Sequence, residues 1–181
     1  MANKIGRIVL GIVIIAALLV GIYYILPGQY KNPLTASIQS ATNNNYSVIV
    51  DKVKASTIPK HKGVTYDSAL NAKTRNLAWT IKKVNVDDAG DGLYDVYADG
   101  YKCTVTFENE ATSDSMITQT NAHVRIVFQI QKKGSVLTIN SKEIEKGSKC
   151  VPTEIHVNET VYKTTDDNNY FQACLDFFAG E

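Results

Sequence analysis

Three cysteines are the residues of this chain most suited to redox or metal chemistry, since a thiolate is both a nucleophile and a metal ligand. No pair of them has the Cys-x-x-Cys spacing of a redox or zinc motif. Cys103 lies among alternating apolar residues, where we expect a free and buried thiol. Cys150 and Cys174 flank a segment with little regular pattern, which a disulfide would tie down. We therefore predict a disulfide between Cys150 and Cys174, while the sequence leaves other pairings open.

The other groups that could do chemistry are dispersed along the chain. His61, His123 and His156 lie far apart and belong to no HExxH motif, so we interpret them as solvated side chains rather than metal ligands. The acidic segment over residues 87–95 lacks the ligand spacing and closing glutamate of an EF-hand, and it is typical of a turn between strands. No GxSxG, SxxK or phosphate-binding loop is present. We therefore expect no catalytic residues, no cofactor, no metal site and no enzymatic activity.

The charge of the chain is close to zero, with 19 Lys and Arg residues against 18 Asp and Glu residues and a formal net charge of +1. Proteins that bind nucleic acid usually carry a large positive charge or a basic block, which attracts the phosphate backbone. We therefore expect no nucleic-acid partner for this chain.

An uncharged apolar run covers residues 8–26. Its 19 residues approach the roughly 20 that a helix needs to cross a bilayer, and bulky residues stand where signal-peptide cleavage requires small ones. Lys4 and Arg7 precede the run, which favours a cytoplasmic amino terminus. We predict an inner (plasma) membrane protein whose last part is periplasmic or extracellular. Its expected parts are a cytoplasmic tip (1–7), a transmembrane helix (8–26), a stalk (27–33) and an exported domain (34–181).

Two small residues within this run, Ala17 and Gly21, are four positions apart and would share one face of a helix. Small residues at this spacing allow another helix to approach closely, so we treat Ala17 and Gly21 as candidates for a helix–helix contact. The alternative is that they are an ordinary lipid-facing Ala and Gly.

The rest of the chain shows both helical and strand-like patterns. The β-branched residues over 46–53 favour a strand, and Thr65 is placed to cap a helix. An apolar stripe over residues 170–178 predicts a C-terminal helix that covers the sheet. Alternating patterns predict further strands over residues 77–81, 93–108, 116–132 and 136–144.

The run over residues 116–132 alternates most regularly and defines a candidate binding face. Its apolar side chains fall on one face, which we expect to lie in the core; they are Val124, Ile126, Phe128 and Ile130. The opposite face carries polar side chains that we treat as candidates for an exposed binding surface, namely His123, Arg125, Gln129 and Gln131.

These patterns predict an α+β fold in which a single N-terminal transmembrane helix precedes one exported domain. We expect that domain to contain a curved antiparallel sheet of about four to five strands, packed by short helices and a C-terminal helix. The layout resembles that of the VirB-type components of bacterial secretion and conjugation machines, whose exported domains have the fold of nuclear transport factor 2. The likeness is one of architecture, and the cytoplasmic tip is much shorter than in that family.

This resemblance and the lack of a catalytic constellation favour a binding role. We predict a single-pass membrane-anchored accessory or structural subunit of a bacterial cell-envelope complex, of the secretion, conjugation, pilus or motor type, that acts by protein–protein binding. Its expected partners are membrane lipid and other membrane or envelope subunits, with a homo-oligomer as one form of the complex. The alternative is a membrane-tethered domain that binds a small lipid, peptide or glycan.

Overall fold

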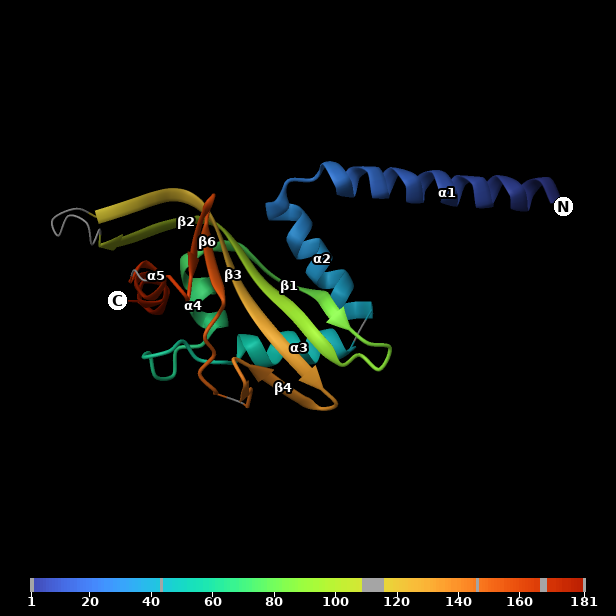
Figure 1. Cartoon of the computed structure of the whole chain (residues 1–181). Helices are drawn as coiled ribbons and strands as arrows, with labels where there is room; N and C mark the ends of the chain where they lie inside the picture. The colour runs from blue at the N-terminus through green and yellow to red at the C-terminus, as the bar shows by residue number, and fades with distance from the viewer. Residues whose placement is uncertain (1, 43, 109–115, 146, 167–168, 181) are drawn as a thin grey trace.

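The computed structural model describes residues 2–42, 44–108, 116–145, 147–166 and 169–180. In this part of the chain an antiparallel sheet forms one layer and helices pack against it (Figure 1). The helices are α1 (Ala2–Ile25), α2 (Gly28–Thr42), α3 (Asn44–Lys54), α4 (Tyr66–Lys73) and α5 (Tyr170–Ala179). The strands are β1 (Arg75–Val86), β2 (Gly92–Glu108), β3 (Met116–Lys133), β4 (Val136–Ile139), β5 (Lys142–Glu143), β6 (Glu154–Val157) and β7 (Thr160–Lys163).

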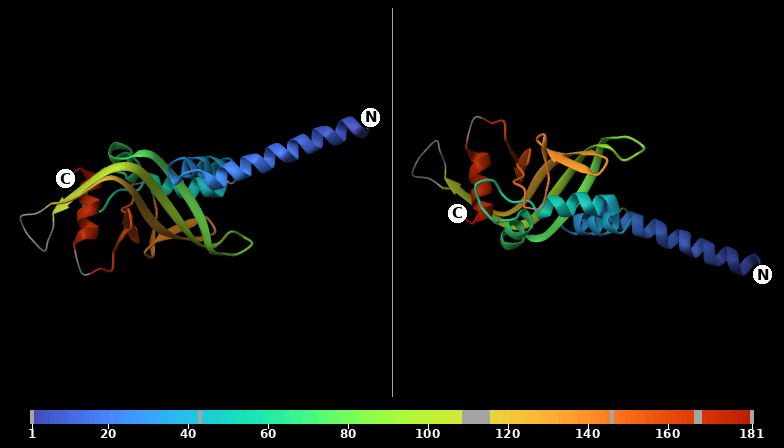
Figure 2. Two further views of the ribbon diagram at one scale, coloured as in Figure 1. Left: turned by 90° about the horizontal axis from the view of Figure 1, so that it is seen from above. Right: turned by 90° about the horizontal axis from the view of Figure 1, so that it is seen from below.

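The sheet is built around the long hairpin of β2 and β3. Its order is β1-β2-β3-β4-β5, and β6 pairs with β3 and with β7. Strand β3 therefore meets two partners on the same edge, β6 along residues 124–127 and β4 along residues 131–133. The strands curve along their length, as two further views show (Figure 2).

The observed fold is α+β, but it differs from the predicted one in the size of the sheet. The expectation of four to five strands is wrong, because the described residues form a sheet of seven strands. Strands β6 and β7 have 4 residues each and β5 has 2. A strand this short carries too few alternations to produce a recognisable sequence pattern. Each one forms here because a neighbouring strand supplies a ladder of hydrogen-bonding groups: β3 for β6, β6 for β7 and β4 for β5.

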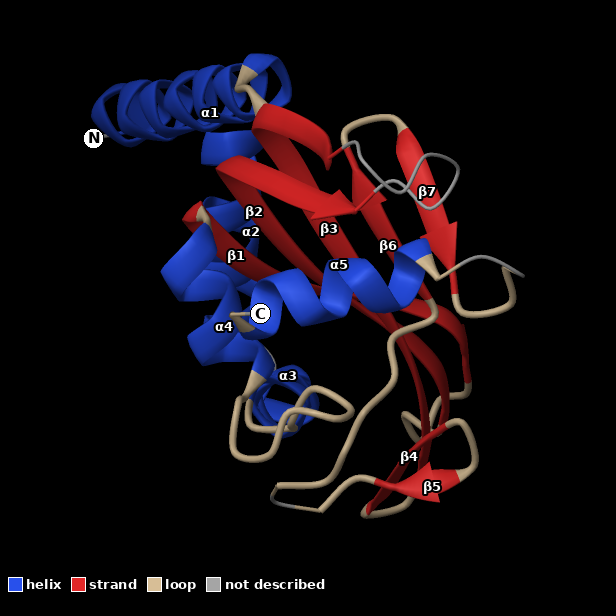
Figure 3. Ribbon diagram, turned by 90° about the vertical axis from the view of Figure 1, so that its left-hand side faces the viewer, coloured by secondary structure: helices blue, strands red, loops and turns tan. Residues whose placement is uncertain are grey.

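The core lies between one face of the sheet and the helices α3, α4 and α5 (Figure 3). Phe128 of β3 is fully buried, with the ring of Tyr66 at 4.8 Å in an edge-on arrangement and that of Trp79 at 6.1 Å in a stacked one. The two polar groups of these rings both form hydrogen bonds. The Tyr66 hydroxyl donates to the Cys150 carbonyl at 2.7 Å, and the Trp79 indole N–H donates to Asp67 at 3.0 Å. The three rings thereby fix α4 against the centre of the sheet.

The segment over residues 46–53 is helical and not the predicted strand. It forms the main part of α3, and its buried side chains are Ile49, Val50 and Val53. Val53 follows Ile49 by four positions and Val50 by three, which places the three side chains on one face of a helix. The β-branched composition favoured a strand, but the burial of this face against the sheet outweighs that weak intrinsic preference.

Thr65 caps the start of a helix, as the sequence predicts. Thr65 is the N-cap of α4, and its hydroxyl accepts a hydrogen bond from the Ser68 N–H at 3.3 Å. Gly180 ends α5 with φ of 103°, in the left-handed region where a residue without Cβ is favoured. Helix α5 exposes little of its apolar stripe, because Phe171, Leu175 and Phe178 are buried.

Helix α2 covers the edge of the sheet at β1. The Gln39 side chain donates from Nε2 to the Ile81 carbonyl at 2.7 Å and accepts from the Ile81 N–H at 3.0 Å. One side-chain amide therefore satisfies both backbone groups of an edge-strand residue, as a neighbouring strand would. Beyond α2, helix α1 extends away from the sheet (Figure 1, Figure 2).

The predicted membrane anchor is wrong. Among the described residues, no helix combines the length and the mean hydropathy that crossing a bilayer requires. The prediction was based on the residue types over positions 8–26. The helix that forms, α1, instead begins at Ala2, includes polar residues in its first two turns and ends at Ile25. The inner-membrane location and the exported domain rested on this anchor, and both predictions are overturned with it.

The predicted disulfide between Cys150 and Cys174 is also wrong. All three cysteines are free and buried, and the burial of Cys103 agrees with its predicted inward position. The Cys150 N–H donates to Thr57 near the start of the loop between α3 and α4, whereas Cys174 belongs to α5. The segment between them needs no covalent tie, because β6 and β7 anchor it to β3. Burial raises the pKa of the Cys174 thiol to about 12, so this thiol stays protonated and unreactive at neutral pH.

Candidate functional site

The face of the sheet opposite the core carries an ordered set of polar and aromatic side chains, which we call the outer face. On β2 it presents Asp95, Tyr97, Asp99 and Tyr101, which alternate with core residues. The antiparallel register places Asp99 opposite Arg125 and Asp95 opposite Gln129 on β3. The alternation of each strand and the register of the hairpin thus bring the opposite charges of Asp99 and Arg125 into one direct cross-strand pair.

Asp99 is the centre of this arrangement. It has no exposed surface, and its Oδ1 accepts two hydrogen bonds, from Arg125 Nε at 2.8 Å and from His123 Nε2 at 2.8 Å. Its Oδ2 is buried and has no hydrogen-bonding partner in the described part of the chain. A buried carboxylate with one unsatisfied oxygen is costly, so its presence calls for a reason beyond the stability of the sheet.

Arg125 is held on two sides by the outer face. Its guanidinium lies 5.2 Å from the centre of the Tyr97 ring, and its Nε is bonded to Asp99. Burial opposes the charged guanidinium, but the hydrogen bond and the negative charge of Asp99 outweigh it and raise the pKa of Arg125. Arg125 is therefore a cation held in one orientation, and 37% of its side-chain surface is exposed.

Tyr97 extends the network along β2 to Asp95. Its hydroxyl donates to Asp95 Oδ2 at 3.0 Å. Burial and this hydrogen bond to a carboxylate raise the pKa of Tyr97 to about 12. The phenol is thus a hydrogen-bond donor at any physiological pH, and its ring is a support for Arg125 rather than a free stacking surface.

The opposite end of the network connects to α2. The His123 ring stacks on the Tyr101 ring, with the centroids 4.4 Å apart and the planes inclined by 6°. Asn32 of α2 donates from Nδ2 to the Tyr101 hydroxyl at 3.0 Å, and Gly28 lies so close that a Cβ there would be 2.8 Å from the same oxygen. Burial and the charge of Asp99 raise the pKa of Tyr101 to about 12.

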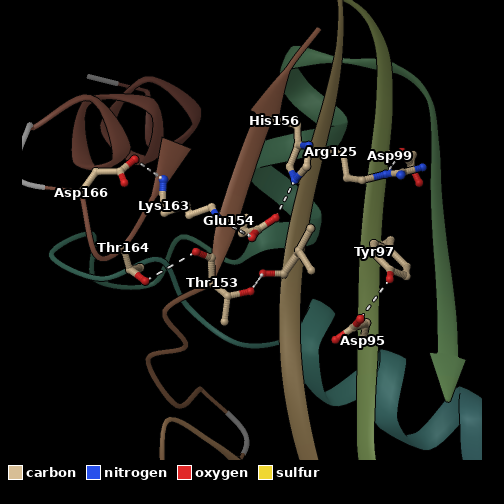
Figure 4. A network of polar contacts seen from close by, with 11 residues as sticks. Asp95, Tyr97, Asp99, Arg125, Thr153, Glu154, His156, Lys163, Thr164 and Asp166 are labelled. Atoms are coloured by element: carbon tan, nitrogen blue, oxygen red, sulfur yellow. Dashed lines mark hydrogen bonds and ion pairs between the residues drawn. The ribbon is translucent and has the colours of Figure 1, made fainter. Parts of the chain in front are cut away.

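Strand β6 and Thr153, which directly precedes it, form one wall of a shallow groove over the outer face, and the close-up shows their side chains (Figure 4). His156 and Glu154 are bonded to each other at 2.9 Å, and Lys163 lies 3.7 Å from the same carboxylate. The Thr153 hydroxyl donates to the Val127 carbonyl at 3.1 Å and ties this wall to β3. The groove has a volume of about 460 Å³, and its polar lining residues are Asp95, Tyr97, Arg125, Gln129, Thr153, Glu154 and His156.

The structure brings together only part of the predicted binding face. His123 and Arg125 meet at Asp99, and Gln129 lines the groove. Gln131 is exposed farther along β3, where it pairs with Thr138 of β4 and does not line the groove. A prediction from one strand could not show this, because the partner of β3 changes from β6 to β4 between these positions.

The interpretation of the histidines as solvated side chains is wrong for His61, whereas His123 and His156 are partly exposed. Each imidazole is bonded to a carboxylate, and His61 is buried with its Nε2 2.7 Å from Asp176. The partners of His123 and His61 lie on other elements, so sequence proximity gives no sign of them. Among the described residues, no group of three His, Cys, Asp or Glu side chains could hold a metal ion.

The other predicted contact residues, Ala17 and Gly21, lie on the exposed surface of α1. A Cβ placed on Gly21 would have no described atom within 4 Å. The two residues are thus accessible to a second helix, and their role in a helix–helix contact stays a prediction.

A second hollow lies between α2, α3 and the edge of β1. It has a volume of about 310 Å³, and its lining includes Tyr46, Leu77 and Trp79 together with Asp51 and Lys54. The lining joins apolar surface to one charge of each sign, which is suited to a small amphipathic molecule.

Comparisons of the chain with protein-family models, with curated proteins and with solved structures each find no match.

Proposed function

We propose that the protein is an accessory or structural subunit of a multiprotein complex and acts by binding another protein through its outer face. The observation that carries this proposal is the Asp99 network, in which a buried carboxylate holds His123 and Arg125, and Arg125 lines an open groove. The groove is shallow and polar, which suits the surface of a protein better than a small apolar ligand.

The energetics of this network support a binding role. Removing a charge from water costs several kcal/mol, and well-packed apolar residues at the same positions are often equally stable or more stable. The outer face around Asp99 is not needed to build the core, since α3, α4 and α5 cover the opposite face. A polar network that fixes the direction of an accessible arginine is instead what specific recognition requires.

Helix α1 supplies a second surface for such a complex. Its side chains include large apolar residues with 50–81% of their surface exposed from Ile12 to Ile25, apart from the half-buried Tyr23. Contiguous exposed apolar surface of this kind marks an interaction site. The small residues Ala17 and Gly21 lie within it, so another helix, including that of a second copy, is a suitable occupant.

Site-specific photo-crosslinking in cells of the native host tests the proposal. A photoreactive amino acid at Gln129, on the outer face, should capture one defined protein. The matched control is Asn71, an exposed residue of α4 on the opposite side of the sheet, which should capture none. Identical products from both positions, or no product from Gln129, would contradict the proposed function.

The hollow between α2, α3 and β1 supports a second candidate function, the binding of a small amphipathic ligand. Trp79 lines this hollow and contributes intrinsic fluorescence as the single tryptophan of the chain. Native mass spectrometry of the purified chain separates the two functions. A bound small molecule that is lost in the Leu77→Asp variant would favour the ligand-binding role over the subunit role.

A further inference from the structure

We propose that Arg125 is the specificity-determining residue of the outer groove and that it binds the carboxylate of an exposed Asp or Glu side chain on the partner protein. This inference rests on the proposed function, because it names the chemistry by which the outer face recognises its partner. It concerns the terminal amino groups of one arginine and the groove into which they open.

Arg125 has five N–H donors, and its hydrogen bond to Asp99 uses one of them. The single N–H at Nε is used by Asp99. The two terminal amino groups, Nη1 and Nη2, have no hydrogen-bonding partner among the described residues, and Arg125 lines the groove. A planar guanidinium with free terminal donors matches a carboxylate through two parallel hydrogen bonds.

The guanidinium is oriented before any partner arrives. Asp99 fixes one edge of it, and the Tyr97 ring supports its face at 5.2 Å. An arginine on a free surface must lose rotamer freedom when it binds, whereas here that loss accompanies folding. Positioning Arg125 is a function that accounts for the burial of Asp99, whose Oδ2 has no hydrogen-bonding partner among the described residues.

The acidic residues of the groove do not prevent an incoming carboxylate from binding. Asp95 already accepts the Tyr97 hydroxyl, and Glu154 is paired with both His156 and Lys163. Gln129, in the same groove, has a side-chain amide without a hydrogen-bonding partner among the described residues. That amide can donate to a carboxylate held by Arg125, which gives the site a second point of recognition.

A pair of isosteric peptides tests this proposal on the full chain. The probes are N-acetyl-Gly-Glu-Gly-amide and N-acetyl-Gly-Gln-Gly-amide, which differ in the carboxylate alone. NMR titration should show saturable shifts of the Arg125 Nε–H signal with the Glu peptide, with a Kd on the order of 1–10 mM. The Gln peptide should bind at least about tenfold more weakly. Equal shifts with both peptides, or no saturable shift with either, would overturn the proposal.

Two variants and one control separate recognition from folding. Arg125→Lys keeps the charge but loses the planar guanidinium with its paired N–H donors, and should weaken binding of the Glu peptide at least about fivefold. The double variant Asp99→Asn, Arg125→Gln leaves no uncompensated buried charge, so it should fold and fail to bind. Arg75→Gln removes another exposed arginine and should bind as the wild type does. Undiminished binding by the double variant would overturn the proposal.

The peptide titration and the cellular cross-linking experiment test different claims, so one can fail while the other succeeds. A defined cross-link from Gln129 without selectivity for the Glu peptide would leave the proposed function standing and reject carboxylate recognition. Selective binding of the Glu peptide without any cross-link would instead support the arginine site and reject the protein-binding function.

Discussion

The Asp99–Arg125 pair allows a quantitative prediction by a double-mutant cycle. Arg125→Gln leaves Asp99 fully buried with His123 as its remaining donor, and should cost about 3 kcal/mol, the lower end of the range for breaking a buried pair. Asp99→Asn keeps the shape but weakens two charge-assisted hydrogen bonds, and should cost about 2 kcal/mol. The double variant should cost only about 2 kcal/mol, because neither charge is left without its partner.

The coupling free energy predicted by this cycle is about 3 kcal/mol, the difference between the sum of the single costs and the double cost. Urea denaturation of the full-length variants, followed by circular dichroism, measures each free energy of unfolding. Arg75→Gln is the control and should stay within about 0.5 kcal/mol of the wild type, since Arg75 is exposed. Additive single costs, with a coupling below about 0.5 kcal/mol, would refute the idea that Asp99 positions Arg125.

Three further predictions concern packing and titration. Phe128→Ala should lower the free energy of unfolding by about 3–5 kcal/mol, because it opens a cavity next to the rings of Tyr66 and Trp79. Gln129→Ala should change it by no more than about 0.5 kcal/mol, and equal losses in urea denaturation would contradict this. Gly100→Ala should cost about 1–3 kcal/mol by thermal and urea denaturation, because its Cβ would lie 2.5 Å from Thr74 Oγ1, and a Thr74→Ala background should reduce that cost. The Tyr97 phenol should titrate with a pKa of about 12 in an ultraviolet difference titration against Tyr97→Phe, because burial and its hydrogen bond to Asp95 both raise this pKa. The stabilisation is then present below pH ~10 and is lost as the pH rises toward 12, and a midpoint near 10 would contradict both the burial and the bond.

The central hairpin shows how far the sequence alone can go. The apolar side chains of β3 from Val124 to Ile130 are buried at alternate positions, as the pattern of the run over 116–132 predicts. Alternation is a strong signal there because the strand is long and one face is covered by helices. The exception is Val127, which is buried on the outer face under the wall formed by β6. A face that looks exposed from one strand can thus be covered by another.

The centre of the candidate site was missed because it depends on register. Asp99 follows Asp95 and Tyr97 at intervals of two, which was a detectable sign of a second polar face on β2. Placing that face next to His123 and Arg125 requires the pairing of Asp99 with Arg125, and the sequence of either strand alone does not fix it. A search for opposite charges across the two longest strands would have suggested it.

Three errors arise from the use of local patterns without their surroundings. A helical segment over residues 46–53 was assigned to a strand from composition, although its burial against the sheet decides its conformation. The predicted bond between Cys150 and Cys174 assumed that the segment between them lacks structure, whereas β6 and β7 order it. The anchor over residues 8–26 was inferred from residue types alone.

The most direct test of the account is photo-crosslinking from Gln129 in cells, repeated in the background of the Asp99→Asn, Arg125→Gln double variant. The account predicts one defined protein product with the wild-type network and its loss in the double variant, while the amount of folded protein stays the same. A cross-link of equal yield in both backgrounds would show that the partner does not depend on the Asp99–Arg125 site and would contradict the central claim.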